Sequence, residues 1–328
     1  MTSEVDAGAG TGEAAPQNRP ESRFRSYLRL GKLDVYDYYL GMLVVAAAVL
    51  LPTSTADPAA LPVLALFLAG EVCTVVAMVA LDDVTGYRDG SDVANYGPND
   101  PLRKKLRKPL VAGTLTTSEA LRFAWSTALA GALLWSAAIA LAPHCPLWTV
   151  AVIVVTYVLA LQYSYGLKLS YCGFQEAFLV ALGMALVLGP YGLATGEFSG
   201  FLLVQSVLFG LGPLMFGVYS NTNDVEGDRA VGRPTVAALT TPRGNAWFIG
   251  ALSAFEFLLG AVASATDVAP WWFVLLVLPA TAMRARQYQL GFLLHDIMRA
   301  RRLGFRVHRT YVALMIAANA LVALGAAG

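Results

Sequence analysis

The chain contains few charged residues for its length. Lys, Arg, Asp and Glu make up 14% of its 328 residues, whereas 57% are hydrophobic, and the mean hydropathy is +0.58. Soluble domains carry about 25% charged residues, so this composition excludes a soluble globular protein and indicates an integral membrane protein. The formal net charge of +1 gives no sign of a nucleic-acid partner, and we expect none.

Cysteine and histidine are also scarce, with three of each. The cysteines are Cys73 in an apolar stretch, Cys145 on the predicted outer side and Cys172 on the predicted inner side. No pair is therefore placed for a disulfide. The histidines are His144 in a predicted outer loop, and His295 and His308 in a basic inner loop. None has metal-ligand spacing with another His or Cys, which argues against a zinc site.

Long apolar windows predict a polytopic fold. A membrane helix needs about 17 to 25 mostly apolar residues, and nine windows of this kind are present. They lie at 35–52, 59–81, 119–142, 146–165, 173–194, 199–220, 244–265, 268–283 and 310–327. We therefore predict an all-α integral membrane protein with nine transmembrane helices.

The residues before the first window differ from the rest. About the first eighteen are rich in Gly, Ala, Ser, Thr and Glu without an apolar core, which predicts disorder. No apolar stretch follows a basic start, so this segment is not a signal peptide. We divide the chain into a disordered cytoplasmic tail, 1–25, and a single transmembrane domain, 26–328.

Basic residues are concentrated in alternate connections. They precede the first window and follow the second, fourth, sixth and eighth, whereas the loops around 53–57, 143–145, 195–197 and 266–267 contain no Lys or Arg. By the positive-inside rule, the basic connections face the cytoplasm. This predicts a multi-pass protein of the cell membrane with a cytoplasmic N-terminus and an external C-terminus.

Two acidic segments follow predicted helices on this cytoplasmic side. The first acidic segment follows the second window and contains Asp82, Asp83 and Asp92. The second acidic segment follows the sixth window and contains Asn221, Asp224 and Asp228. If the helix continues through the second segment, its two carboxylates are four residues apart and share a face with the amide.

Oxygen ligands at the ends of membrane helices suggest a site for magnesium and a lipid-tailed diphosphate. Mg²⁺ is usually held by one or two carboxylates plus substrate phosphates. All six residues named above are candidate ligands, and the candidate catalytic residues are Asp82, Asp83, Asp224 and Asp228. Basic side chains stabilise negative charge on a departing group. The candidates for binding the diphosphate are Lys108, Lys168, Arg229 and Arg233. The bilayer is the expected surrounding of the lipid tail, and no obligatory protein partner is evident.

The nine windows, the two acidic segments and the stretch Lys108-Pro-Leu-Val-Ala-Gly113 together resemble the UbiA superfamily of intramembrane prenyltransferases. Gly173-Phe-Gln-Glu176 and Asp228-Arg-x-x-Gly232-Arg-x-Thr235 are similar to the branch that prenylates dihydroxynaphthoate. The resemblance implies a helical bundle around a central cavity. It also implies that an isoprenyl diphosphate binds through Mg²⁺ to both acidic segments, with its tail directed into the membrane.

The first acidic segment departs from the pattern that this superfamily usually shows. The usual motif begins Asn-Asp-x-x-Asp, but here the Asn and the second Asp are replaced by Asp82 and Gly86. A Gly or Ala at the second position is similar to the UbiA-type terpene cyclases. This favours intramolecular cyclisation after the diphosphate leaves, and prenyl transfer to an aromatic acceptor such as a dihydroxynaphthoate or a phenol remains the alternative.

Two further classes fit less well. A non-enzymatic lipid carrier has no need of two acidic clusters at helix ends, and transporters of inverted repeats bind their substrates near the midplane. A phosphatidyl transferase also uses paired aspartates and magnesium, but with a different spacing and fewer spans. We therefore expect a magnesium-dependent membrane enzyme that ionises an isoprenyl diphosphate.

Overall fold

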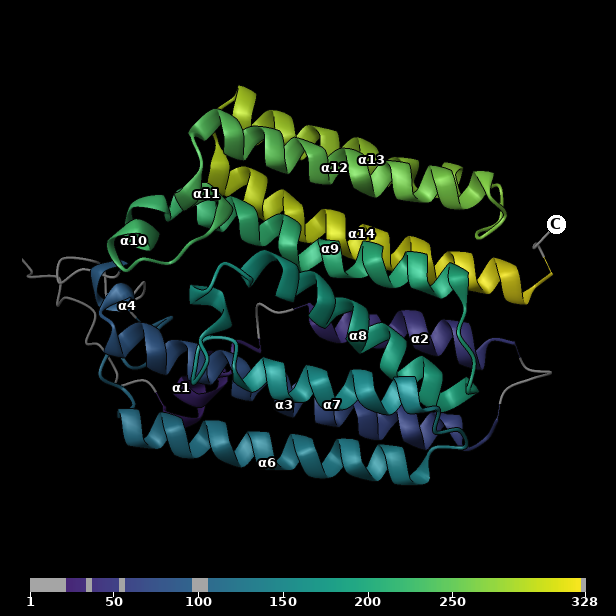
Figure 1. The fold of residues 1–328 in the computed structure, drawn as a ribbon, viewed down its shortest axis with the longest axis horizontal. Coiled ribbons are helices and arrows are strands. Elements are labelled where there is room, and N and C mark those ends of the chain that lie inside the picture. The colour runs from purple at the N-terminus through teal and green to yellow at the C-terminus, as the bar shows by residue number, and fades with distance from the viewer. Residues whose placement is uncertain (1–21, 34–36, 53–56, 96–105, 326–328) are drawn as a thin grey trace, which may run out of the picture.

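The computed structural model describes residues 22–33, 37–52, 57–95 and 106–325. In this part of the chain the regular structure is helical, and nine helices of ten residues or more lie roughly along one direction (Figure 1). They are α2 (Gly41–Leu50), α3 (Ala60–Arg88), α6 (Thr117–Leu141), α7 (Leu147–Leu161), α8 (Gln175–Thr195), α9 (Gly200–Asn223), α12 (Pro242–Ala265), α13 (Phe273–Tyr288) and α14 (Ile297–Ala323). Each overlaps one predicted window, so the predicted all-α fold is confirmed.

Five of these helices, α3, α6, α8, α9 and α12, are both long and apolar enough to cross a bilayer. The shorter α7 is apolar as well, and so is the stretch 38–50 that includes α2. This supports a multi-pass membrane protein, while the exact number of nine spans remains a prediction. The predicted tail, 1–25, lies mostly outside the described residues, and its last three residues begin the helix α1 (Arg23–Leu30).

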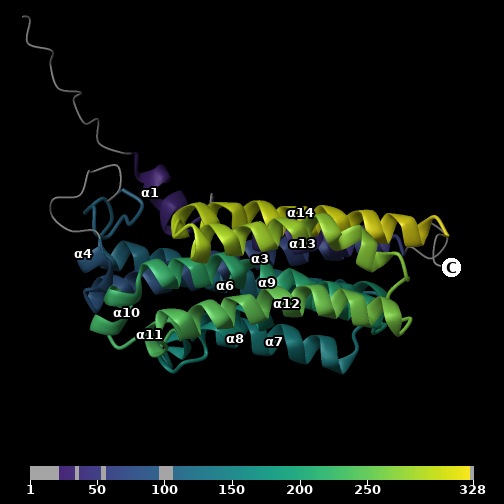
Figure 2. The same ribbon diagram turned by 90° about the horizontal axis from the view of Figure 1, so that it is seen from above.

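Short elements gather at one end of the bundle. They include α1, α4 (Ser91–Asn95), α10 (Val225–Ala230) and α11 (Val236–Leu239), and both views place them at the end opposite the C-terminus (Figures 1 and 2). We call this the motif end, because α3 and α9 carry the two acidic segments there. The remaining short elements are the 3₁₀ turns η1 (Tyr38–Leu40) and η2 (Leu169–Tyr171) and the π-helical turn η3 (Gln289–Leu293).

Local signals explain where several helices begin. At α6, Thr116 and Glu119 form a reciprocal capping box, which satisfies backbone donors that the first turn leaves free. The hydroxyl of Ser199 accepts from the backbone of Leu202 at the start of α9. At α12, Thr241 is the N-cap and Pro242 occupies the first turn, where its missing N–H costs nothing.

Small residues let the helices approach closely. A Cβ added at Gly183 of α8 would lie 2.5 Å from the Cα of Gly210 in α9. A Cβ at Gly70 of α3 would lie 2.4 Å from the indole of Trp135 in α6, whose N–H donates to the carbonyl of Phe67 at 3.0 Å. Lipid tails are as apolar as Leu, so membrane helices associate through such close packing rather than through water exclusion.

The prediction of a basic inner loop over residues 284–309 is wrong except at 294–296, where His295 lies between η3 and α14. This stretch continues α13, forms η3 and starts α14, which begins thirteen residues before the predicted window. Arg284 is buried in α13 and donates to both carboxylate oxygens of Glu256 in α12, at 2.6 and 2.7 Å. His308 is fully buried in α14 and packs against Phe209 with ring centroids 5.0 Å apart. Hydropathy alone treats both residues as loop residues, because it cannot show that a partner or an aromatic wall surrounds them.

Candidate active site

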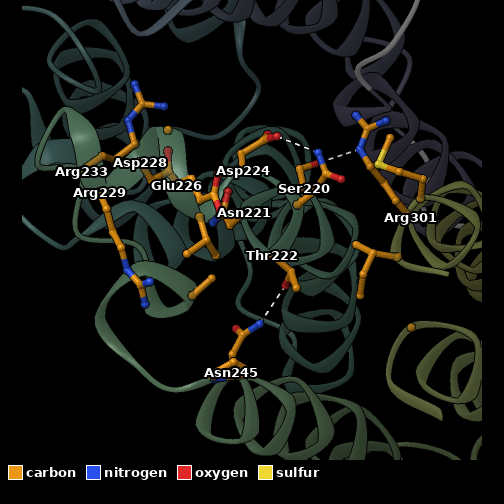
Figure 3. Close-up of a pocket in the computed structure, with 18 of the residues that line it drawn as sticks. Ser220, Asn221, Thr222, Asp224, Glu226, Asp228, Arg229, Arg233, Asn245 and Arg301 are labelled. Carbon is orange, nitrogen blue, oxygen red and sulfur yellow. Dashed lines mark hydrogen bonds between the residues drawn. The ribbon is translucent and has the colours of Figure 1, made fainter. Parts of the chain in front are cut away.

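A cavity of about 1180 Å³ opens at the motif end of the bundle (Figure 3). Its lining comes from α4, the segment before α6, the end of α9, α10, α11, the start of α12 and the region from η3 to α14. The first acidic segment contributes Asp92, and Lys108 lies beside it. The second acidic segment lines the cavity with Asn221, Asp224 and Asp228. The structure thus brings residues more than 120 positions apart in the sequence to one cavity.

The carboxylates of the first acidic segment are paired with basic side chains. Asp83 is buried, and its Oδ1 lies 2.8 Å from Nζ of Lys108 and 3.0 Å from Nζ of Lys32. Lys108 also contacts Asp92 at 2.9 Å, and Lys32 contacts Asp82 at 3.4 Å. Burial alone would disfavour the ammonium of Lys108, but the neighbouring Asp83 raises its pKa above the usual value. Lys108 is therefore a fixed positive charge between two carboxylates.

Gly86 has a structural role in this cluster. A Cβ built at Gly86 would lie 2.9 Å from both Cγ and Oδ2 of Asp92, which reaches α3 from α4. Real Cβ atoms essentially never come this close, so the carboxyl group of Asp92 occupies the space that a side chain at position 86 would need. The carboxylate absent at position 86 is thereby supplied to the same cluster by Asp92.

The second acidic segment interrupts its helix without losing the predicted spacing. α9 ends at Asn223 and α10 begins at Val225, with Asp224 between them in a non-helical conformation. The backbone N–H of Asp228 still donates to the carbonyl of Asp224 at 2.9 Å, so the two residues remain one helical turn apart. Burial raises the pKa of Asp228 to about 6, and Thr235 donates to its Oδ2 at 3.1 Å.

Asn221 is held by two residues of α8. Nε2 of Gln175 donates to Oδ1 of Asn221 at 3.3 Å, and Nδ2 of Asn221 donates to Oε1 of Glu176 at 3.4 Å. The same Glu176 oxygen accepts from the backbone N–H of Val236 at 3.0 Å, which ties α11 to α8. These contacts fix the amide and leave one lone pair of Oδ1 for another partner.

Arg233 and Tyr171 connect the two acidic segments. The guanidinium of Arg233 lies 3.7 Å from Asp82, donates to the hydroxyl of Tyr171 at 3.0 Å and lies 4.8 Å from the centroid of its ring. The Tyr171 hydroxyl donates in turn to Asp89 at the end of α3. Burial, together with the hydrogen bond to Asp89, raises the pKa of Tyr171 to about 12, so its hydroxyl keeps its proton at neutral pH.

The other two predicted diphosphate-binding residues lie further from the carboxylates. Lys168 is exposed and its Nζ lies 5.3 Å from the centroid of the Tyr171 ring. Arg229 donates to the backbone carbonyls of Ala238 in α11 and of Thr240, which follows α11. Figure 3 shows its side chain extending away from that of Arg233. Within the described ranges neither residue forms an ion pair with an acidic side chain.

The oxygen atoms of the two acidic segments suit a hard cation that also has water or phosphate ligands. Among the described residues, no group of three or more His, Cys, Asp or Glu side chains is placed to hold a metal by itself. The second acidic segment offers two carboxylates and one amide oxygen, and Oδ2 of Asp83 is buried without a hydrogen-bond partner in the first. Mg²⁺ keeps several waters and uses substrate phosphates as ligands, so such an incomplete shell fits it.

Sequence reasoning missed several residues at this site. Lys32 is one of the basic residues that precede the first predicted window and indicate orientation only. Its place beside Asp83 depends on a left-handed backbone conformation with φ of 48°. Glu176 and Thr235 stood in the motifs of the resemblance, which is the signal that could have identified them. Tyr171 carried no signal, since its contacts join three segments that are remote in sequence.

Comparison with known proteins identifies the fold. Residues 40–308 match the sequence profile described as the UbiA prenyltransferase family. A search of curated proteins finds no match. Among solved structures, the chain is similar to one described in a study of digeranylgeranylglyceryl phosphate synthase, with a TM-score of 0.62 and 14% identity over 91% of this chain and 99% of that chain.

Two archaeal structures show the same arrangement. A UbiA homologue from Archaeoglobus fulgidus, bound to DMAPP and Mg²⁺, has a TM-score of 0.59 and 13% identity over 88% of this chain and 99% of that chain. An apo UbiA homologue from Aeropyrum pernix K1 has a TM-score of 0.57 and 19% identity over 85% and 96%, respectively. At these identities the structural likeness shows the fold.

Proposed function

Because the chain belongs to the UbiA prenyltransferase family, we propose that it ionises an isoprenyl diphosphate with Mg²⁺ and transfers the prenyl group to an acceptor. The observation that carries this proposal is the convergence on one cavity of Asp92 from the first acidic segment, the whole second acidic segment, and the basic residues Lys108 and Arg233. Asp82 and Asp83 do not line this cavity; they contact Arg233 and Lys108, respectively, from behind it. The Archaeoglobus fulgidus homologue, with its bound DMAPP and Mg²⁺, supports the substrate class and the metal.

The chemistry begins at the bond between C1 of the prenyl chain and the bridging oxygen. When this bond breaks, its electron pair leaves with the diphosphate and an allylic cation remains. Bound Mg²⁺ would neutralise charge on the phosphate oxygens. Asn221, Asp224 and Asp228, which line the cavity, would hold the metal, and Lys108 and Arg233 would donate to the departing diphosphate.

The cavity favours an external acceptor for the cation. Part of its wall is polar without carrying a carboxylate: Thr222 accepts from Asn245 at 2.8 Å, and Arg301 donates to Ser220 (Figure 3). An acceptor needs room and hydrogen-bonding groups of this kind, whereas a cyclase needs an enclosed apolar wall. Transfer would be completed when the acceptor forms a bond to C1 and loses a proton.

Intramolecular cyclisation is the second candidate function. It rests on Gly86, which matches the pattern of the UbiA-type cyclases. The contact between Gly86 and Asp92 weakens this argument, because the number of carboxylates in the first acidic segment is maintained. In a cyclase, the double bonds of the substrate would capture the cation and no acceptor would be consumed.

One experiment separates the two fates. The purified protein is incubated with Mg²⁺ and geranyl, farnesyl, geranylgeranyl or geranylfarnesyl diphosphate, each with and without phenolic, dihydroxynaphthoate or polar lipid acceptors. Prenyl transfer predicts diphosphate release and an adduct that require an acceptor. Cyclic hydrocarbons or alcohols formed without an acceptor would establish cyclisation instead, and no Mg²⁺-dependent turnover under any condition would contradict the proposed function.

We also propose that the motif end faces the cytoplasm of a cell membrane. The basic connections support this orientation. Cys145 and Cys172 are both exposed and lie at opposite ends of the bundle. In intact cells, an impermeant thiol reagent should therefore modify Cys145 and spare Cys172. The reverse labelling would place the acidic segments outside.

A further inference from the structure

The short helix α1 packs against the protein with one of its faces. Ser26 and Leu30, four residues apart, are fully buried. Tyr27 packs against Phe123 of α6 with ring centroids 5.0 Å apart and the rings tilted by 41°, and Arg23 lies 2.9 Å from Glu119 at the start of α6. These contacts hold α1 beside the first turns of α6, at the motif end (Figures 1 and 2).

The opposite face of α1 is apolar and exposed. Phe24 is 72% exposed and Leu28 is 38% exposed, and their spacing of four residues places them on one stripe. Arg25 and Arg29 form a basic stripe beside it. An amphipathic helix with aromatic and aliphatic residues on one side and Arg on the other is suited to the plane of a membrane surface, where basic residues attract anionic headgroups.

Neighbouring aromatic residues mark the same level of the molecule. Trp125 of α6 is 44% exposed and contacts the edge of Tyr165, with ring centroids 6.0 Å apart. Trp125 follows Phe123, the partner of α1, by two residues. Trp and Tyr are enriched where a bilayer meets water. The exposed Trp125 therefore marks the expected level of the membrane surface, and α1 lies at this level.

A short and firmly packed connection joins α1 to the first acidic segment. The backbone N–H of Gly31 donates to Tyr27 at 2.9 Å, and a Cβ at Gly31 would lie 3.2 Å from Val76 of α3. Lys32, the next residue, lies 3.0 Å from Asp83 and 3.4 Å from Asp82. The position of the Lys32 ammonium is thus tied to the position of α1.

We infer that α1 is an interfacial helix that binds the anionic lipid surface of the motif-end leaflet, and that this binding holds Lys32 in the first acidic segment. Anionic lipid would then strengthen the binding of the substrate diphosphate through Lys32. The position of α1 in the membrane stands on its own, whereas its effect on the substrate rests on the proposed function.

The first test measures where α1 lies. A variant with C73A, C145S and C172S carries F24C labelled with an environment-sensitive fluorophore, in nanodiscs of phosphatidylcholine with or without about 30% phosphatidylglycerol. We expect a label at position 24 that is shielded from an aqueous quencher, more strongly with the anionic lipid. A D267C label, in the exposed turn after α12, should remain accessible in both. Equal and full accessibility at position 24 in both lipids would overturn the proposal.

The second test measures the consequence for the site. The dissociation constant of a non-hydrolysable prenyl diphosphate with Mg²⁺ should fall about fivefold when phosphatidylglycerol is added, an effect the size expected for one or two basic residues at an anionic surface. F24S/L28S should remove this lipid dependence, and so should K32M, while K32R should retain it. The triple variant F24S/L28S/K32M should bind the analogue no more weakly than K32M alone. F198S changes an exposed aromatic residue at the opposite end of the bundle and should leave the dependence intact.

The two tests separate the possible failures. If no analogue binds in either lipid, the proposed function fails, and the fluorescence measurement still decides where α1 lies. If the analogue binds but K32M keeps the lipid dependence of the wild-type protein, the connection through Lys32 is wrong. Additive losses from K32M and F24S/L28S would contradict it as well.

Discussion

The two acidic segments meet at one cavity but differ in how their charge is balanced. In the first, Asp82, Asp83 and Asp92 are paired with Lys32, Lys108 and Arg233. In the second, no ion pair within the described residues reaches Asp224 or Asp228. The side chain of Asn223 donates to Asp224 at 2.9 Å, and Thr235 donates to Asp228 at 3.1 Å. The carboxylates of the first segment are therefore paired directly with basic side chains, whereas those of the second are only influenced by the more distant charge of Arg233.

This difference indicates a division of labour. Partial burial disfavours the charged form of Asp228 and raises its pKa to about 6, although the positive charge of Arg233 opposes this shift. A divalent cation would stabilise the charged form, so the second acidic segment is the better site for Mg²⁺ in the absence of substrate. Lys32 and Lys108 are already held beside the carboxylates of the first segment, where they are suited to bind the diphosphate of the substrate.

The largest effect is expected from removing the ligands of the second segment. Asp224→Ala and Asp228→Ala should each lower turnover by at least about 100-fold, because loss of one electrostatic stabiliser commonly costs this much. Glu226→Ala, in the same short helix and exposed, should change turnover less than about threefold. Turnover is measured as diphosphate release in detergent, with folding checked by circular dichroism. More than a tenth of wild-type activity in both Asp variants would refute the assignment.

The next prediction compares stability without metal. Asp83→Asn leaves two partly buried ammonium groups without their shared partner, and it should lower the free energy of unfolding by about 3 kcal/mol. Asp224→Asn breaks no ion pair and should change it by less than about 0.5 kcal/mol. Thermal unfolding in EDTA measures both. Equal destabilisation would show that the two segments do not differ in charge balance.

Magnesium should act mainly through the second segment. At a concentration about 100 times its dissociation constant, Mg²⁺ should stabilise the wild-type protein by about 2.7 kcal/mol. Asp228→Asn should lose most of this stabilisation, while Asp83→Asn, despite its lower starting stability, should keep at least half. A Mg²⁺ effect lost equally from both variants would place the metal between the segments even without substrate.

The smallest effect concerns the packing of the first segment. Gly86→Ala places a methyl group against the carboxylate of Asp92, and overpacking of this kind costs about 1–3 kcal/mol. We expect about a tenfold loss of turnover as Asp92 moves away from Lys108. Gly217→Ala is the matched control, since its nearest neighbour is Leu179 at 3.8 Å. If Gly86→Ala is as active as Gly217→Ala, the close contact has no role in the reaction.

The fold and the position of the acidic residues at helix ends could be predicted from the sequence because both depend on local patterns, while the roles of these residues stay predictions. Apolar windows are long and strong signals, and each of the nine overlaps a helix, although the bounds differ by up to thirteen residues. Asp224 and Asp228 follow an apolar run directly, so their place at a helix end required no tertiary information. The same holds for Asp82 and Asp83 at the end of α3.

The rest depended on tertiary contacts. Lys32 reaches Asp83 through a left-handed turn, and the role of Gly86 appears only when α4 returns to α3. Arg229 and Arg233, close in sequence, extend in opposite directions because a tight loop separates them (Figure 3). No spacing rule distinguishes the arginine that meets Asp82 from the one that binds backbone carbonyls.

The buried pair of Arg284 and Glu256 affects how the chain enters the membrane. α13 has only sixteen residues, carries Arg284 in its last third, and is not among the described helices that are long and apolar enough to cross a bilayer. On insertion scales a charged residue costs an inserting helix up to about 2.5–3.5 kcal/mol, the value at the helix centre. Glu256 lies on the preceding helix, and only a short turn separates α12 from α13. The two helices are therefore best inserted together as a hairpin, each neutralising the charge that would delay the other. During synthesis, α12 would wait at the translocation machinery until its successor emerges from the ribosome.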